Sequence, residues 1–107
     1  MVHRGRAMLG KTLLEADVEK HFRKRSKLNR IWAVKIFPFN SKGFPDRLCL
    51  GENRLVFFVE LKRPTGGKLS ARQDIIHKLL KQFGFKVYVL TTKEEVNSFY
   101  EEKPFCS

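Results

Sequence analysis

The sequence of 107 residues contains few cysteines and no long apolar run. The spacing of its two cysteines, Cys49 and Cys106, matches no pattern of metal ligands, so we expect two free thiols in a reducing cytosol. No run of about 18 apolar residues is present to cross a membrane, and no signal-peptide core follows the basic N-terminal residues. These absences favour a single cytoplasmic domain with a core large enough to fold alone.

The sequence also lacks internal repeats, low-complexity tracts and the patterns of a helix-turn-helix or zinc finger. Recognition of a nucleic acid would therefore depend on its shape and phosphates rather than on its base sequence. None of the three histidines, His3, His21 and His77, has a suitably spaced partner. We expect each of them at the surface or half-buried, and no histidine as a general base.

Acidic residues are scarce relative to basic ones. The chain has 22 lysines and arginines against 11 acids, a formal net charge of +11. The excess is concentrated in residues 1–35, which hold 10 of the basic residues and only 3 of the acids. A positive field of this strength attracts polyanions, and nucleic acid is the first candidate.

Apolar periodicity and turn residues predict a regular series of elements. Thr12 is the expected N-cap of the first helix, Ser70 caps the second helix, and Gly84 ends it. The predicted elements, in order, are helix 13–28, strands 31–37, 46–50 and 55–62, helix 71–83, strand 86–91 and helix 93–102.

This α-β-β-β-α-β-α order predicts an α/β fold with one mixed sheet of about four strands flanked by helices. The first three strands form an antiparallel meander, and the fourth returns through a helical crossover, parallel to a neighbour. The fourth strand is apolar enough to be central. One domain spans residues 1–107, with a basic tail at 1–12 and a second tail at 103–107.

Two carboxylates are expected at the same end of the predicted hairpin. With a turn near residues 52–53, Asp46 pairs with residue 59 or 60, which places it beside Glu60. Two close carboxylates repel each other unless a proton or a cation lies between them. Mg²⁺ binds through one or two carboxylates, waters and a substrate phosphate. Lys62, two residues after Glu60, then points to the same place.

A plainer interpretation stays open for Glu60 and Lys62 alone, because a surface salt bridge explains many such strand pairs. Asp46 at the facing end of the hairpin, preceded by Gly43 and Pro45, favours a metal site instead.

The ordered phrases GFPD at residues 43–46, ELK at residues 60–62 and Gln73 resemble the motifs of VRR-NUC (virus-type replication-repair nuclease) domains, a branch of the PD-(D/E)XK nuclease superfamily. The similarity extends from about Leu14 to Tyr100. It is greatest to short, standalone phage and bacterial members. The resemblance implies a single PD-(D/E)XK nuclease-like domain in the cytosol of a bacterium or a phage-infected host.

The resemblance also implies roles for individual residues. Asp46 and Glu60 match the metal ligands of the family, and the backbone carbonyl of Leu61 matches a third ligand. Lys62 matches the catalytic lysine. Gln73 matches a helix glutamine beside the site, although it could also be only a polar residue in the first turn of a helix.

The superfamily places a first-helix glutamate near the metal, and Glu15 and Glu19 compete for this role. Val18 and Phe22 follow Glu15 at i+3 and i+7, which turns Glu15 toward the sheet and favours it as a metal ligand. Glu19 could instead be a surface acid paired with Arg23.

By resemblance, the expected activity is Mg²⁺- or Mn²⁺-dependent endonucleolytic cleavage of branched DNA, of the kind carried out by Holliday junction resolvases, by a homodimer. A catalytically silent nucleic-acid-binding module, a flap-cutting or nicking monomer and a sequence-specific restriction-type enzyme are the alternatives. An apolar dimer surface could come from Trp32, Phe37, Phe39 and Phe44. The expected DNA contacts are Arg23, Lys24, Lys27, Lys35, Lys42, Arg47, Arg63 and Lys68.

Overall fold

A computed structural model describes residues 10–36, 43–62 and 68–106, and the side chains within them from residue 16 onward. Every predicted helix and strand is present, with ends that differ by at most a few residues. The elements are α2 (Gly10–Leu28), β1 (Trp32–Lys35), β2 (Arg47–Leu50), β3 (Val56–Leu61), α3 (Ala71–Gln82), β4 (Lys86–Leu90), α4 (Lys93–Glu102) and a 3₁₀ turn, η1 (Pro104–Cys106).

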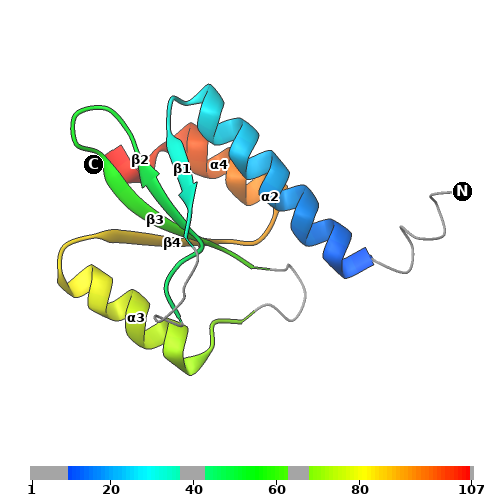
Figure 1. Ribbon diagram of the computed structural model, residues 1–107. Coiled ribbons are helices and arrows are strands. Elements are labelled where there is room, and N and C mark those ends of the chain that lie inside the picture. The colour runs from blue at the N-terminus through cyan, green and yellow to red at the C-terminus, as the bar shows by residue number, and fades with distance from the viewer. Residues whose placement is uncertain (1–9, 37–42, 63–67, 107) are drawn as a thin grey trace, which may run out of the picture.

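The strands form one sheet in the order β1-β2-β3-β4 (Figure 1). β1, β2 and β3 are antiparallel neighbours, and β4 pairs with β3 in parallel after the α3 crossover. The predicted meander and crossover are confirmed. The prediction that the fourth strand is central is wrong, because β4 is an edge strand and its Val89 is 40% exposed.

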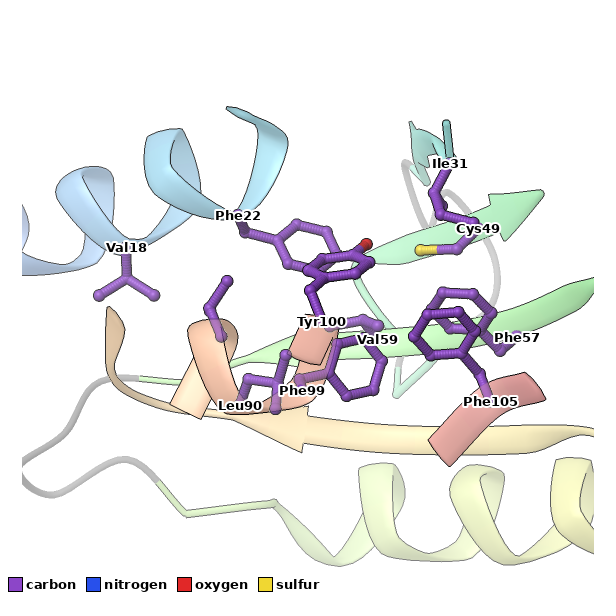
Figure 2. Packing of buried hydrophobic residues seen from close by; sticks show 11 residues of the cluster. Val18, Phe22, Ile31, Cys49, Phe57, Val59, Leu90, Phe99, Tyr100 and Phe105 are labelled. Carbon is purple, nitrogen blue, oxygen red and sulfur yellow. The ribbon is translucent and has the colours of Figure 1, made fainter. Parts of the chain in front are cut away.

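The larger core lies between the sheet and the pair α2 and α4 (Figure 1). Phe57 of β3 stacks on Phe105 with ring centroids 4.4 Å apart, and Phe99 packs edge-on against Phe57 (Figure 2). The segment predicted as a C-terminal tail therefore contributes a buried ring to the core, since Phe105 is 4% exposed. Burying a phenylalanine side chain stabilises a fold by about 1.5–3 kcal/mol.

The opposite face of the sheet carries a smaller cluster under α3. Phe58, Leu80 and Val87 are buried there, and Phe44 packs edge-on against Phe58 at 5.6 Å. Phe44 thus belongs to the core. The apolar residues of α3 are only partly covered, because α3 packs on β4, the edge strand of the sheet. The exposed ones are Ile75, Leu79 and Phe83.

Local capping sets the ends of the helices. The Ser70 hydroxyl accepts a hydrogen bond from the Gln73 backbone, and the Gln73 side chain accepts one from Ser70 N–H, so the predicted cap is confirmed as a full capping box. Gly84 follows α3 at φ +96°, as its predicted role requires. The prediction of Thr12 as an N-cap is wrong, because α2 begins at Gly10.

Gly43, in the loop before β2, lies close in space to the first turn of α3. Its φ is +94°, and a Cβ added there would lie 2.8 Å from the carbonyl oxygen of Arg72. Only glycine accommodates both the backbone angle and this close approach. The segment that leads to Asp46 therefore passes close to the first turn of the helix that carries Gln73.

Both cysteines are free, as predicted, with Cys49 buried in β2 and Cys106 exposed. Burial raises the pKa of the Cys49 thiol to about 12, so this thiol stays protonated and inert. Within the described segments, no helix is both long and apolar enough to cross a bilayer.

Candidate active site

Asp46 and Glu60 lie next to each other at the end of the β2–β3 hairpin. The register pairs Arg47 with Val59, which sets Asp46 opposite Glu60. Asp46 N–H donates a hydrogen bond to Glu60 Oε1 at 3.2 Å, and Leu61 N–H donates one to Asp46 Oδ2 at 2.9 Å. The predicted juxtaposition is therefore present, and each carboxylate is held by the backbone of the other's strand.

Glu60 receives two further contacts from the residues expected beside it. Gln73 Nε2 donates a hydrogen bond to Glu60 Oε2 at 3.1 Å, and Lys62 Nζ lies 3.6 Å from the same oxygen. Gln73 thus performs both roles that the sequence allowed, since its carbonyl oxygen caps α3 through Ser70 while its amide group orients Glu60. The α3 cap therefore determines the position of a carboxylate in the site.

The charged form of Glu60 is disfavoured by its surroundings. Only 3% of this residue is exposed, and burial together with the nearby charge of Asp46 raises the pKa of Glu60 to about 7. The charge of Lys62 and the hydrogen bonds from Asp46 and Lys62 lower this pKa, but they do not offset the burial. A buried carboxyl group with a raised pKa, next to a second carboxylate and a lysine, marks a candidate functional site.

A cleft of about 330 Å³ opens in front of these residues. α2, β1 and the ends of β2 and β3 form its walls, so the sheet and the first helix converge on it. Its lining residues are Ala16, Val18, Glu19, Lys35, Asp46, Leu61 and Lys62.

Glu19 enters this cleft from α2 and is bound by cations of the sheet. Arg47 donates a 2.6 Å hydrogen bond to Glu19 Oε2, and Lys35 Nζ lies 3.6 Å from the same oxygen. Burial raises the pKa of Glu19, but the Arg47 hydrogen bond and the Lys35 charge more than compensate, so the pKa lies below its usual value. The surface pairing of Glu19 with Arg23 that the sequence suggested is replaced by this inward pair.

Glu15 lies one turn before Glu19 in α2, but its side chain falls outside the described part. The preference for Glu15 as the first-helix acid therefore remains a prediction. Glu19 is the acid of this helix that the described side chains bring into the cleft with Asp46 and Lys62.

The donor set fits a divalent cation of the magnesium type. Hard cations take oxygen ligands, and Mg²⁺ is held by one or two carboxylates, with water and phosphate completing its shell. Among the described side chains, no group of three or more His, Cys, Asp or Glu is arranged around one point. Asp46, Glu60 and the carbonyl oxygen of Leu61 are the oxygen groups at this end of the hairpin that would hold such an ion.

Arg47 was expected to contact DNA, and this expectation is wrong. The residue is 5% exposed, and its guanidinium binds Glu19 and the carbonyl oxygen of Ala33 at 3.1 Å. In β2 its side chain points to the same buried face as Cys49, because side chains alternate along a strand. This alternation was the available signal that Arg47 faces inward.

Five of the other predicted DNA contacts are exposed, and Lys42 and Arg63 lie outside the described residues. Trp32, proposed above for a dimer surface, is 70% exposed, and Phe37 and Phe39 lie outside the described residues. The five exposed basic residues are Arg23, Lys24, Lys27, Lys35 and Lys68.

Of the three histidines, His3 lies outside the described residues, and His77 differs from expectation. His21 is half-buried and bonds Asn97, whereas His77, one turn after Gln73 in α3, is only 3% exposed. Burial and the charge of Lys81 lower the pKa of His77, which disfavours the charged form of its ring. Its spacing of four from Gln73, on the inner face of α3, was the signal for this burial.

Comparison with known proteins supports the architecture. No family model and no curated protein match the sequence. A solved structure described as "VRR_NUC domain" superposes with a TM-score of 0.75 and 24% sequence identity, over 81% of this chain and 94% of that one. The fold that the motif resemblance implied is therefore confirmed, and this chain has the fold of a VRR_NUC domain.

Proposed function

We propose that this protein is a metal-dependent endonuclease that hydrolyses phosphodiester bonds in branched DNA. The observation that carries the proposal is the pair Asp46 and Glu60, locked together at a cleft that also contains Lys62. The fold shared with a VRR_NUC domain supports a nuclease-type activity. The formal charge of +11 supports a polyanionic substrate.

The side chains of the cleft divide the chemistry among them. A bound Mg²⁺ or Mn²⁺ would neutralise charge on the phosphate and lower the pKa of water. Lys62 Nζ, which contacts Glu60 from the cleft, donates a hydrogen bond to a phosphoryl oxygen and stabilises its growing charge. The Asp46 N–H and the Gln73 amide each donate a hydrogen bond to one oxygen of Glu60. The carboxylate is therefore already oriented and would bind a metal ion without reorganising.

The Arg47–Glu19 pair positions the wall of the cleft. Arg47 ties α2 to β1 and β2 through Glu19 and the Ala33 carbonyl, so the helix cannot move away from Asp46 without exposing a buried guanidinium. Glu19 is then in place to orient water at the edge of the site. Glu15 remains the alternative acid for this role.

We assign the active form to a homodimer. One chain carries one Asp46, Glu60 and Lys62 set, and two symmetric cuts in a four-way junction require two such sites. The apolar area for a contact is available on α3, where Ile75, Leu79 and Phe83 are 61%, 42% and 67% exposed.

The test is a panel of linear, flap and four-way DNA substrates, each incubated with Mg²⁺, with Mn²⁺ and with a chelator. Asp46→Ala, Glu60→Ala and Lys62→Ala should abolish cleavage, while affinity for the four-way junction in chelator stays within about threefold, because phosphate affinity comes from many basic residues. Glu101→Ala and Lys81→Ala, exposed residues away from the cleft, are the controls.

The same experiment separates the alternatives. Binding without cleavage of any substrate under either metal would identify a silent nucleic-acid-binding module. Cleavage of flaps alone by a protein of monomer mass would identify a flap-cutting or nicking enzyme. Wild-type cleavage by any of the three site variants would reject the site itself.

A further inference from the structure

A second hollow lies beside the first, at the other end of the contact between α2 and β1. It has a volume of about 460 Å³, and the nuclease chemistry proposed above makes no use of it. Its lining residues are Arg23, Ser26, Lys27, Arg30, Ile31, Trp32 and Ala33. Three of these residues are basic and none is acidic.

Trp32 gives this hollow an exposed aromatic side. It is 70% exposed at the start of an edge strand, although tryptophan is largely buried in most folds. Leu28, the last residue of α2, is 65% exposed nearby in the sequence. An indole left in solvent beside cations presents a flat apolar surface with positive charge at its border.

Three basic residues, Arg23, Lys27 and Arg30, line the hollow beside Trp32. Arg23 and Lys27 are four residues apart in α2 and so lie on one helix face. Arg30 follows the helix in a left-handed conformation at φ 61°, and its contact with Glu52 at 3.1 Å joins two solvent-exposed side chains, which makes it weak. All three guanidinium or ammonium groups are therefore accessible to an anionic ligand.

The hollow and the catalytic cleft are neighbours along the same two elements. Glu19 of the cleft lies one helical turn before Arg23, and Lys35 of the cleft ends the strand that Trp32 begins. Three strand residues span about 10 Å, and the eight residues from Glu19 to Lys27 span about 12 Å. Adjacent nucleotides in a strand are about 3.4 Å apart along a duplex, so about three duplex steps span this distance, and an extended unpaired strand spans it in fewer.

We propose that this hollow binds an unpaired nucleotide of the DNA substrate, with the base stacked on Trp32 and the flanking phosphates on Arg23, Lys27 and Arg30. Aromatic stacking within a basic groove is how proteins hold single strands without reading sequence. A base inside a duplex cannot offer its face to an indole, so Trp32 selects DNA with unpaired positions. The proposal rests on the nuclease function above and narrows its substrate class to branched or tailed DNA.

A protein partner fits this surface less well. Interfaces between proteins are depleted of lysine and of charge at their centre, whereas cations line this hollow around a single aromatic residue. A second copy of the chain, with its net charge of +11, would bring like charges together here.

Trp32 is the only tryptophan of the chain, which provides a direct reporter. Oligodeoxythymidylate of about 15 nucleotides, titrated in chelator so that no cleavage occurs, should quench the tryptophan fluorescence as bases stack on the indole. Trp32→Ala should weaken binding of this strand about tenfold, and Trp32→Phe should recover most of the loss. Binding of a blunt duplex of equal length should change less than about twofold in both variants.

Val89→Ala is the control, because Val89 is 40% exposed and lies on β4, at the opposite edge of the sheet from β1 and the hollow. It should leave the affinity for the single strand unchanged. Absence of quenching, an equal effect of Trp32→Ala on single strand and duplex, or a change of sedimentation mass in Trp32→Ala would each overturn the subsite. Quenching without any metal-dependent cleavage would keep the subsite and reject the nuclease, whereas cleavage without quenching would do the reverse.

Discussion

At Glu60, burial opposes the charge that a metal ligand must carry. Its pKa is raised from 4.5 to about 7, so the folded protein binds the proton more tightly than the unfolded chain does. Without metal, the free energy of unfolding therefore falls as the pH rises from 4.5 to 7, by about 3 kcal/mol in total from this group.

Glu60→Gln removes this titration and should show it. Relative to the wild type, the variant should gain about 3 kcal/mol of stability between those two pH values, in denaturant unfolding with chelator present. Added Mg²⁺ should reduce the gain, because the ion stabilises the charged wild-type carboxylate alone. An unchanged difference across this pH range would mean that the pKa of Glu60 is the same in the folded and unfolded states.

Glu15 and Glu19 of α2 are the two candidates for the helix acid that acts at the site. Since Glu19 is bound by Arg47 at 2.6 Å in the cleft, Glu19→Gln should lower the rate of cleavage at least about tenfold. If Glu15 is instead the metal-proximal acid, Glu15→Gln should be the costlier change. Single-turnover cleavage rates of the two variants at saturating Mg²⁺ decide between them.

The elements were largely predictable because their signals are local. Ser70, Gly84 and the apolar spacing of 71–83 determine α3 within a few residues, and the spacing from Asp46 to Glu60 determines the hairpin register. The position of β4 at the edge was not predictable. A strand is apolar when helices cover its faces, whether or not it has a neighbouring strand on both sides. The inward Arg47–Glu19 pair joins residues 28 apart in sequence, and no local pattern specifies it.

Gly43 and Gly84 allow a matched test of the close approach between the loop before β2 and α3. Both have φ near +95°, but only at Gly43 would a Cβ meet another backbone, that of Arg72. Gly84→Ala should cost about 1 kcal/mol from the backbone angle alone. Gly43→Ala should cost at least about 2 kcal/mol and also lower activity, because the shift displaces the segment leading to Asp46 relative to Glu60, which Gln73 of α3 holds.

Denaturant unfolding and cleavage rates of the two glycine variants provide the measurement. Equal costs at the two positions would mean that the segment around Gly43 moves freely from α3, and that the close approach does not hold Asp46 in place.

For the whole molecule, the distribution of charge predicts a steep response to salt. Counterion release gives a log–log slope of about −0.9 for each phosphate contacted, so the five exposed residues among the predicted contacts imply a slope of about −4 to −5. Junction binding measured by anisotropy in chelator, over a range of NaCl concentrations, tests this value. A slope near zero would show that the basic surface does not bind DNA.

The assembly is the second prediction for the whole molecule. Sedimentation at micromolar concentration should give about 25 kDa, twice the chain mass of 12.6 kDa. Leu79→Asp should return the mass to that of the single chain, since it places a charge in the exposed apolar row of α3. Trp32→Ala, the matched exposed residue outside this row, should leave the dimer intact. A single-chain mass that stays unchanged with junction DNA would reject the dimer.

β3 also has a consequence for aggregation. Its six residues, VFFVEL, contain no proline and one charge, a composition typical of segments that stack into cross-β fibres. In the folded chain β2 and β4 cover both of its edges, and in the unfolded chain Glu60 is the charge that discourages stacking. Replacing Glu60 by Gln therefore has opposite effects on two properties: the folded state becomes more stable above pH 7, while any chain that unfolds aggregates faster.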